Sequence, residues 1–397
     1  MVRTLVVTND YPPRPGGIQE FVQAMVDGFT PSDVVVYAST WRDRGRECEK
    51  YDLEHPYLTV RDRTSVLLPE PRVVRRAAEI ARAEGCERVW FGAAAPLGLM
   101  GGALRKAGVT RLVATSHGHE AGWAQLPAAR QLLRRIGESV DVITYLSEYQ
   151  RRKIGAVVTP AAAARMVQLA PGVDVTRFRP ELRGSEQAEA IKAKYSLTGR
   201  PVVVCVSRLV PRKGQDTLIK AWPQVQRSIP DAALLIVSGG PDKERLHKLV
   251  DATGVARSVT LTGSVPWADL PLYFAAGDVF AMPCRTRRGG LDVEGLGIVY
   301  LEASATGLPV VGGDSGGAPD AVLEGRTGYI VSGRGDTERV PATAERIITL
   351  LADPAAARAM GTAGRTWVEG RWQWPTIQER FQALLAGSPV DRDQSAP

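Results

Sequence analysis

Residues 285–302 read RTRRGGLDVEGLGIVYLE, in which arginines and glycines give way to a run of apolar residues. The change predicts a loop that passes into a helix beginning near Leu296. Such a helix start leaves backbone N–H groups unpaired and presents the positive end of the helix dipole, so it is suited to an anion. Glu294 precedes the helix and Glu302 lies nearly two turns inside it, which suits hydroxyl groups at two depths of one pocket. A buried turn with two solvated carboxylates is the alternative.

The length and composition are those of a globular protein with about two domains. The chain has 397 residues, 44% of them hydrophobic and 23% charged, which is ordinary for globular proteins but long for one core. No apolar run approaches the ~18 residues of a membrane span, and residues 1–8 lack the pattern of a signal peptide. The cysteines form no CxxC pair, which favours reduced thiols in the cytoplasm. They are Cys48, Cys86, Cys205 and Cys284.

The positive charge is concentrated in the first half. Residues 1–180 hold 25 Lys+Arg against 19 Asp+Glu, a net of +6, out of +7 for the whole chain. A basic half indicates nucleic acid, an anionic membrane face or an acidic ligand as a partner. No nucleic-acid-binding signature accompanies the charge, so nucleic acid is disfavoured.

Strand and helix patterns alternate along the first half, which predicts a parallel, doubly wound sheet. The first strand leads through NDYPPRPGG, with Gly16 and Gly17, into a helix, and the glycines allow a backbone to approach a ligand closely. A plain tight turn is the alternative. We expect strands at 4–8, 34–37, 89–91, 111–115 and 140–146, and helices at 18–26, 73–83 and 128–137.

His117, His119 and Glu120 follow the strand that ends at Thr115. Ligands of open α/β sheets bind beyond the carboxyl ends of the strands, so these side chains are candidates for chemistry. The H-x-H pair lacks a third metal ligand, and structural histidines remain an alternative.

A basic helix follows, with Arg130, Arg134 and Arg135 on it and RRK at 151–153 after it. We expect this helix to bind an anionic membrane peripherally, with a merely solvated face as the alternative.

The second half repeats the α/β pattern after a segment at 170–180 that is typical of the end of a domain and a polar segment at 181–199. Arg208 and Lys213 lie in the SRLVPRKG loop after its first strand, where they suit the two phosphates of a nucleotide diphosphate. The loop from Gly263 to Val265 suits a flat base held by backbone contacts, or is an ordinary loop. Expected strands are 201–206, 233–237, 259–262, 279–282, 309–312 and 329–331, and the last helix is expected at about 376–385.

Together these motifs resemble the retaining glycosyltransferases of family four, whose GT-B fold has two Rossmann-like domains. The resemblance rests on the E-x7-E pair of Glu294 and Glu302, on Arg208 and Lys213 in their loop, and on the Gly16–Gly17 pair. It runs over nearly the whole chain. It implies an N-terminal acceptor and membrane-binding domain at 1–173 with about 375–388, a donor domain at 174–374 and a flexible tail at 389–397.

The resemblance is strongest to the actinobacterial mannosyltransferases that act on phosphatidylinositol monomannoside. Arg288 departs from that pattern, because a third glycine is expected there. The matching segments are TNDYPPRPGGIQ (8–19), FGAAAPL (91–97), HGHE (117–120), VPRKGQD (210–216) and GLDVEGLG (290–297).

What the resemblance implies is a GDP-mannose donor, a phosphoinositol mannolipid acceptor and an α-1,6 linkage made with retention, without a metal or other cofactor. It implies a cytoplasmic enzyme associated peripherally with the plasma membrane. The implied catalytic residues are Arg208, Lys213, His117 and Glu294. The implied donor-binding residues are Gly16, Gly17, Arg208, Lys213, Gly263, Val265, Glu294, Leu296, Gly297, Ile298, Val299 and Glu302, and the implied acceptor and membrane residues are His119, Glu120, Arg130, Arg134 and Arg135.

Three other functions are compatible with the residues. A related transferase would use another nucleotide sugar or a soluble acceptor. A nucleotide-sugar epimerase would share the two-domain layout, although the Arg208 and Lys213 loop with E-x7-E disfavours it. A non-catalytic nucleotide-sugar binder would bind GDP without turnover.

Overall fold

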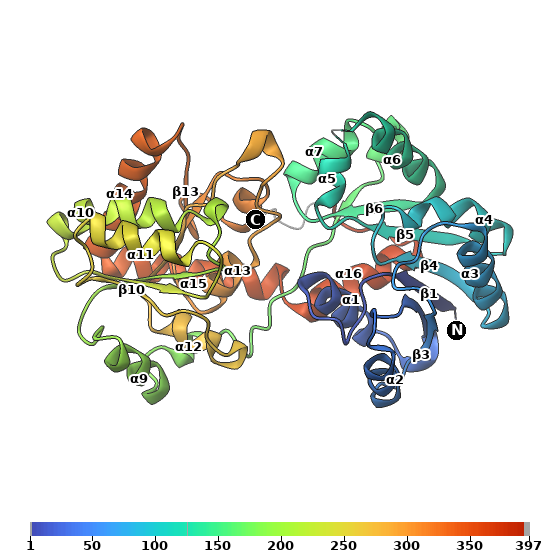
Figure 1. Ribbon diagram of the computed structural model, residues 1–397, viewed down its shortest axis with the longest axis horizontal. Helices are drawn as coiled ribbons and strands as arrows, with labels where there is room; N and C mark the ends of the chain where they lie inside the picture. Colours follow the sequence, from blue (N-terminus) through green and yellow to red (C-terminus); the bar gives the residue numbers. More distant parts are fainter. Residues whose placement is uncertain (1, 125, 393–397) are drawn as a thin grey trace. The chain divides into compact units, whose positions relative to one another are not determined.

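The computed structural model describes residues 2–124 and 126–392, and Figure 1 shows their ribbon. The chain forms two compact units, one of residues 2–171 with 374–392 and the other of residues 172–373. Each unit is built on one sheet in which neighbouring strands pair in parallel, with helices on both faces. No helix in the described part of the chain has the length and apolarity to span a bilayer.

The sheet of the first unit has seven strands in the order β3-β2-β1-β4-β5-β6-β7. The strands are β1 (Arg3–Thr8), β2 (Val34–Ser39), β3 (Leu58–Asp62), β4 (Cys86–Phe91), β5 (Arg111–Thr115), β6 (Val142–Tyr145) and β7 (Val167–Gln168). The helices are α1 (Gly17–Asp27), α2 (Gly45–Glu54), α3 (Pro71–Ala83), α4 (Gly101–Lys106), α5 (His119–Trp123), α6 (Pro127–Ser139), α7 (Glu148–Gly155), α8 (Pro160–Ala163) and α16 (Trp374–Ala386).

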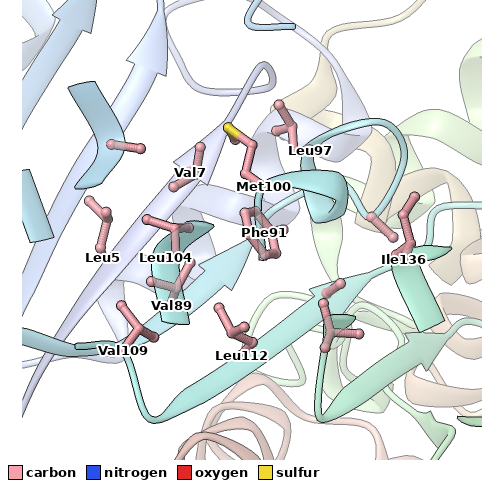
Figure 2. Close-up of a cluster of buried hydrophobic side chains, with 14 of the residues drawn as sticks. Leu5, Val7, Val89, Phe91, Leu97, Met100, Leu104, Val109, Leu112 and Ile136 are labelled. Carbon is pink, nitrogen blue, oxygen red and sulfur yellow. The ribbon is translucent and has the colours of Figure 1, made fainter. Parts of the chain in front are cut away.

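Each face of this sheet carries its own core, because successive side chains of a strand point to opposite faces. Leu5 and Val7 pack with Phe91 in the cluster of Figure 2, whereas Val6 belongs to the cluster on the other face. Covering both faces explains why the strands read as nearly continuous apolar runs.

Helix α16 completes the second of these cores. The Phe381 ring is fully buried and packs edge-on against Trp90, with the ring centroids 4.7 Å apart. Burying such a ring stabilises the fold by roughly 1.5–3 kcal/mol. The chain therefore returns to the first unit after building the second, as the GT-B resemblance implies.

The sheet of the second unit has six strands in the order β10-β9-β8-β11-β12-β13. The strands are β8 (Val202–Val206), β9 (Ala233–Val237), β10 (Val259–Leu261), β11 (Val279–Met282), β12 (Val310–Gly313) and β13 (Gly328–Val331). The helices are α9 (Glu186–Lys194), α10 (Gln215–Ser228), α11 (Lys243–Ala252), α12 (Leu270–Ala275), α13 (Ile298–Ala305), α14 (Asp336–Ala352) and α15 (Pro354–Arg371).

The strands expected from apolar runs are all present, but elements with little apolar pattern were missed. Strand β3 is mostly half-exposed, and Leu58 at its start is exposed. Helix α9 lies inside the segment expected to be merely polar, and Ala188 is its one buried residue. The segment 389–397 is described only as far as Arg392, whose carbonyl accepts hydrogen bonds from the Gln168 N–H and the Tyr145 hydroxyl.

Candidate functional site

The candidate residues of the second unit lie in loops at the carboxyl edge of its sheet. In a parallel sheet all strands end at the same edge, so loops that are far apart in sequence meet there. The loops that carry candidates follow β8, β10, β11 and β12, at residues 207–214, 262–266, 283–297 and 314–317.

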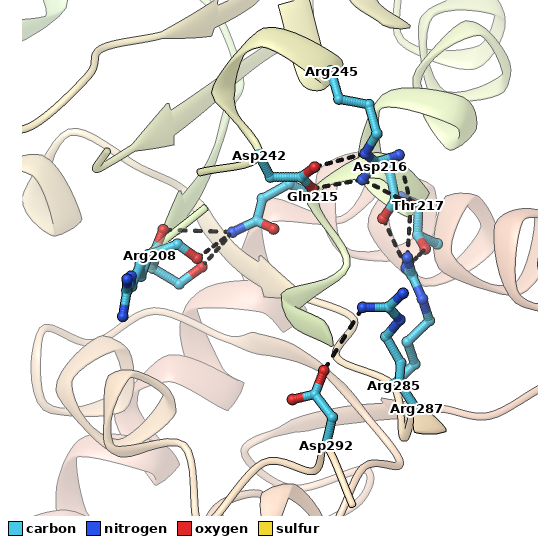
Figure 3. Close-up of polar contacts among 10 residues, drawn as sticks. Arg208, Gln215, Asp216, Thr217, Asp242, Arg245, Arg285, Arg287 and Asp292 are labelled. Atoms are coloured by element: carbon cyan, nitrogen blue, oxygen red, sulfur yellow. Dashed lines mark hydrogen bonds and ion pairs between the residues drawn. The ribbon is translucent and has the colours of Figure 1, made fainter. Parts of the chain in front are cut away.

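The loop after β8 is held by hydrogen bonds from Gln215, and the Arg208 side chain in it is exposed. The Gln215 side-chain amide donates to the Ser207 hydroxyl at 2.8 Å and to the Arg208 carbonyl at 3.1 Å, as Figure 3 shows. Within the residues that the structure describes, the Arg208 guanidinium has no hydrogen bond or ion pair. Its charge is therefore available to a ligand while its backbone is held in place.

Lys213 and Glu294 are in direct contact. The Lys213 ammonium lies 2.7 Å from Glu294 Oε2, and the two residues are only 9% and 6% exposed. Arg212 Nε lies 3.7 Å from the same oxygen. Gly214 follows with φ +80°, and a Cβ there would lie 2.2 Å from the Pro283 carbonyl oxygen, so only glycine fits.

Asp216 ties the start of α10 to the start of the 285–302 segment. Arg285 donates to both of its carboxylate oxygens at 2.7 Å, and Arg245 lies 3.4 Å away (Figure 3). Burial acts to raise the pKa of Asp216, but the hydrogen bonds and positive charge of Arg285 outweigh it, so the pKa lies below its usual value. Buried and paired, this carboxylate holds the segment against the sheet edge.

The segment then folds back on itself. The Arg287 N–H donates to the Asp292 carbonyl at 2.9 Å, and the Asp292 N–H donates back at 3.2 Å. Arg288, Gly289 and Gly290 between them have φ of +50°, +62° and +95°. Arg288 therefore adopts a left-handed conformation that costs a non-glycine residue about 1–2 kcal/mol, at the position where the resemblance led us to expect glycine.

The glycine loop after β12 supports Glu294 from behind. The Glu294 N–H donates to the buried Ser315 hydroxyl at 3.1 Å, and the Gly317 N–H donates to the Glu294 carbonyl at 2.9 Å. Gly316 lies so close that a Cβ would come within 2.1 Å of the same carbonyl oxygen. This contact explains why a glycine is needed at 316.

Helix α13 begins at Ile298, two residues later than we expected. Gly297 precedes it in a left-handed conformation, with φ +83°, and no side chain caps the helix start. The N–H groups of its first turn therefore have no side-chain cap, and such a helix start is suited to an anion. The depth predicted for Glu302 was wrong: at a rise of about 1.5 Å per residue it lies little more than one turn in, about 6 Å along the axis.

The loop at Gly263 is anchored through its carbonyl. That oxygen accepts hydrogen bonds from the Ser238 N–H at 3.1 Å and the Thr262 hydroxyl at 2.8 Å. Nearby, the Arg177 guanidinium stacks on the exposed Trp267 ring, 3.1 Å from its centroid. No local pattern predicts this stacking, because the two residues belong to distant segments.

In the first unit, the glycine loop and His117 lie beyond the ends of β1 and β5. Gly17 opens α1, and a Cβ on it would meet nothing within 4 Å. His117 Nε2 lies 2.6 Å from the Gly92 carbonyl oxygen, so this nitrogen carries the proton. The buried Glu120 accepts hydrogen bonds from the N–H groups of His117 and Gly118 at 3.0 and 3.2 Å. Glu120 thus shapes the loop that carries His117, while the His119 side chain lies outside what the structure describes.

The arginines of α6 are exposed, and two of them line a groove between α6 and α7. The groove has a volume of about 540 Å³, and a second hollow of about 370 Å³ adjoins it. Arg130 lines both and Arg134 lines the second, whereas Arg135 lines neither. The larger hollow is also lined by Tyr149, Arg152 and Lys153 of α7 and by Ala156 and Val157.

Two family models match the two halves of the chain. Residues 15–177 match the model described as Glycosyltransferase Family 4, and residues 187–367 match Glycosyl transferases group 1. The chain is 49% identical over 387 residues to the GDP-mannose-dependent alpha-(1-6)-phosphatidylinositol monomannoside mannosyltransferase of Mycolicibacterium smegmatis, covering 96% of this chain and 98% of the relative. This chain belongs to glycosyltransferase family 4.

Further comparisons agree with this membership. The glycosyltransferase is 46% identical over 387 residues to the GDP-mannose-dependent monoacylated alpha-(1-6)-phosphatidylinositol monomannoside mannosyltransferase of Corynebacterium glutamicum, covering 98% of each chain. The crystal structure of Anabaena HepE in complex with UDP matches with a TM-score of 0.76 at 20% identity, over 97% of this chain and 100% of that one. That likeness confirms the expected GT-B fold.

In this glycosyltransferase, the second-unit residues that we expect to bind the donor lie in loops at one edge of its sheet, whereas Gly16 and Gly17 lie in the first unit. They combine two cations, an uncapped helix start and two carboxylates, which is a set able to hold phosphate and hydroxyl groups together. The supporting residues were not predicted: Asp216, Gln215, Arg285 and Ser315 act through contacts between separate loops. The Asp-Ser-Gly-Gly run at 314–317 marks a glycine loop in the sequence, but nothing in its pattern indicates that it supports Glu294.

Proposed function

We propose that this glycosyltransferase moves mannose from GDP-mannose to a phosphatidylinositol monomannoside, making an α-1,6 linkage and a dimannoside product. Two relatives that carry this activity in their names are 46% and 49% identical over almost the entire chain. The geometric support is the contact between Lys213 and Glu294, because a cation beside a carboxylate suits a ligand that carries both phosphate and hydroxyl groups. A sugar attached to a diphosphate presents these two groups side by side.

In the proposed donor complex, each group of the site has one task. Arg208, Lys213 and the N–H groups at the start of α13 bind the diphosphate, and Gly16 and Gly17 are further donor-binding residues that the resemblance implies. Glu294 binds the hydroxyls of the sugar and Glu302 those of the ribose. The backbone from Gly263 to Val265 binds guanine, and His117 is a further catalytic residue that the resemblance implies. The proposed donor-binding residues at the start of α13 are Leu296, Gly297, Ile298 and Val299.

The proposed transfer retains the configuration of the mannose. The acceptor hydroxyl attacks the anomeric carbon on the face from which the diphosphate leaves, the bond from carbon to the phosphate oxygen breaks, and the hydroxyl proton passes to that phosphate. Arg208 and Lys213 stabilise the negative charge that develops on the leaving group. Removing one group aimed at such charge slows a reaction about 100- to 1,000-fold.

A donor-by-acceptor assay tests the function. The protein is incubated with radiolabelled GDP-mannose, or with UDP- and ADP-sugars, and with phosphatidylinositol, its monomannoside or soluble inositol acceptors. We expect label only in a dimannolipid made from GDP-mannose, with the linkage read by mass analysis. Transfer from another donor, transfer to soluble acceptors alone, or epimerised UDP-sugar without acceptor would each contradict the proposal. Undiminished transfer in excess EDTA is expected for a metal-independent reaction.

We also propose that the enzyme binds anionic membranes through the groove between α6 and α7. Arg130, Arg152 and Lys153 line it and Arg134 lines the adjoining hollow. Each basic group near an anionic surface contributes about 1 kcal/mol. Co-sedimentation with vesicles that contain 30% anionic lipid tests this surface. Arg130→Gln with Arg134→Gln is expected to weaken binding at least about tenfold, whereas Arg135→Gln, outside the groove, serves as the control. Equal losses in both variants would mean that net charge alone matters.

A further inference from the structure

A pocket of about 280 Å³ opens in the second unit, at the edge of the sheet opposite the loops that carry the donor candidates. Its lining includes Pro201, Val279 and Pro309, which stand at or directly before the first residues of β8, β11 and β12. The donor candidates follow the last residues of the same strands. Strands of four or five residues are roughly 13–17 Å long, so the pocket is separate from the candidate donor site.

One wall of this pocket is apolar. Leu350 and Leu351 at the end of α14 and Ala357 near the start of α15 contribute to it, and all three are buried. Val279, the first residue of β11, is fully buried beside them. Because these residues belong to two helices and a strand of the core, the wall is already shaped, and a preformed apolar wall favours a ligand with an apolar part.

The charged residues of the lining carry an excess of positive charge. The Asp278 carboxylate is already engaged, because its Oδ2 accepts the Val202 N–H at 2.8 Å and its Oδ1 lies 3.6 Å from Arg183 Nη2. It therefore offsets at most one of three guanidinium charges. The charged lining residues are Arg183, Arg200, Arg358 and Asp278.

Two of these arginines repel each other. Burial lowers the pKa of Arg183 below its usual value, Asp278 acts against this lowering, and the positive charge of Arg358 adds to it. Arg358 is exposed, and within the described residues its guanidinium has no hydrogen bond or ion pair. An anion that accepts hydrogen bonds from both guanidinium groups would replace this repulsion with attraction.

The backbone holds the other two arginines in place. Arg183 Nη1 donates to the Gly307 carbonyl at 3.0 Å. Arg200 Nε and Nη2 donate to the carbonyls of Asp231 and Ala232 at 2.9 and 3.1 Å. A guanidinium that is fixed before binding loses less entropy when it pairs with a ligand.

The start of α15 adjoins the pocket but does not itself offer an anion site. The Asp353 side chain accepts hydrogen bonds from the N–H groups of Ala355 and Ala356 at 3.1 and 3.0 Å. These bonds cap the helix, so an anion in this pocket would be held by guanidinium groups.

We propose that this pocket is a second ligand site, which binds a small carboxylate with an apolar body, the carboxylate on Arg183 and Arg358 and the body on the apolar wall. A volume of about 280 Å³ lies near the lower limit of ligand pockets, roughly 300 Å³, so the ligand is small. Asp278 in the lining disfavours a doubly charged phosphate. The site does not depend on which donor and acceptor the enzyme uses.

Calorimetric titration of the full chain with octanoate and with benzoate, each with and without GDP, tests the pocket. We expect at least one of these carboxylates to bind, with the same affinity when GDP is present. Acetate lacks the apolar body and octanol lacks the charge, so both should bind at least about tenfold more weakly. The proposal is wrong if neither carboxylate binds, if GDP displaces it, or if acetate, octanol or inorganic phosphate binds as tightly.

Arg358→Gln tests whether the carboxylate binds at this pocket. Because the guanidinium has no partner among the described residues, we expect an unchanged Tm together with a loss of carboxylate affinity of about tenfold or more. Arg257→Gln, an exposed arginine of the same unit outside the pocket, is the control and should change neither quantity. Wild-type affinity in Arg358→Gln would overturn the assignment.

Hydrogen exchange locates the bound carboxylate independently of the variants. Octanoate or benzoate, whichever binds, should slow exchange of the amides at the end of α14 and the start of α15. It should leave the loops at 207–214 and 283–297 unchanged. Slowed exchange in those loops alone would place the ligand at the donor site and refute a second one.

Discussion

Replacing Lys213 by methionine is expected to damage both the stability and the activity of the enzyme, for separable reasons. The change removes the partner of a carboxylate that is 6% exposed, since Glu294 Oε2 lies 2.7 Å from the Lys213 ammonium. Breaking a buried ion pair by removing one partner costs roughly 3–5 kcal/mol. Arg212 stays 3.7 Å from the same oxygen, so we expect a value near the lower end, about 3 kcal/mol.

The reverse change and the combination complete a double-mutant cycle. Glu294→Gln leaves the buried ammonium unpaired and is expected to cost a similar amount. The double variant Lys213→Met with Glu294→Gln removes both charges, and replacing a whole buried pair is often nearly neutral. Its stability should therefore return to within about 1 kcal/mol of the wild type, which implies a coupling energy of roughly 5 kcal/mol or more.

Scanning calorimetry and mannosyl transfer measure the two effects separately. For a unit of about 200 residues, 1 kcal/mol shifts Tm by about 2–4 °C, so each single variant should melt roughly 6–12 °C lower. Transfer should fall at least about 100-fold in Lys213→Met and stay low in the double variant. Arg208→Gln is the control for stability: its side chain is exposed and unpaired within the described residues, so transfer should fall as far while Tm hardly moves.

A Lys213→Met variant that melts with the wild type would refute this reasoning, because the ion pair would then contribute nothing to the fold. A double variant that remains as unstable as the singles would show that packing of the lysine stem, rather than its charge, is what the site requires. Recovery of transfer in the double variant would show that Lys213 does not act on the leaving phosphate.

Three further predictions concern the supports of the site. Gly17→Ala should leave Tm unchanged, because a Cβ there meets nothing within 4 Å, yet lower transfer at least about tenfold, because the resemblance makes Gly17 a donor-binding residue; Gly102→Ala, equally open, is the control, and equal activity of both variants would remove Gly17 from the donor-binding residues. Asp216→Asn should cost about 3 kcal/mol at pH 7 and weaken GDP binding by loosening Arg285. Since the folded pKa of Asp216 is depressed, its contribution is present above the unfolded value of about 3.9 and is lost as pH falls through the lower folded value, so the urea midpoints of variant and wild type should converge below pH ~4. Arg288→Gly should change stability by less than about 1 kcal/mol, because relief of the left-handed strain is offset by greater freedom of the unfolded chain; a larger loss of stability in urea would assign the arginine side chain a contact.

The family membership and the positions of most strands could be predicted from short contiguous patterns. Apolar β-branched runs such as VVVCV at 202–206 specify a strand wherever they are buried on both faces. Glu294 and Glu302, eight positions apart, and the loop of Arg208 and Lys213 each lie within one segment, so their spacing is visible in the sequence. Elements without an apolar face, such as β3 and α9, carried no such signal.

The sequence alone thus determined the two α/β units and the groups available to a donor, because these follow from the local order of residue types. Only the tertiary structure decided that Lys213 touches Glu294, that Arg285 holds Asp216 from 69 positions away, and that Arg183 shares a pocket with Arg358. These contacts join loops that converge only when the strands align in a parallel sheet, so no local pattern records them. The late start of α13 has the same origin. Gly297 adopts a left-handed conformation, so the first helical residue is Ile298 and Glu302 lies about one turn, instead of two, after the start of the helix.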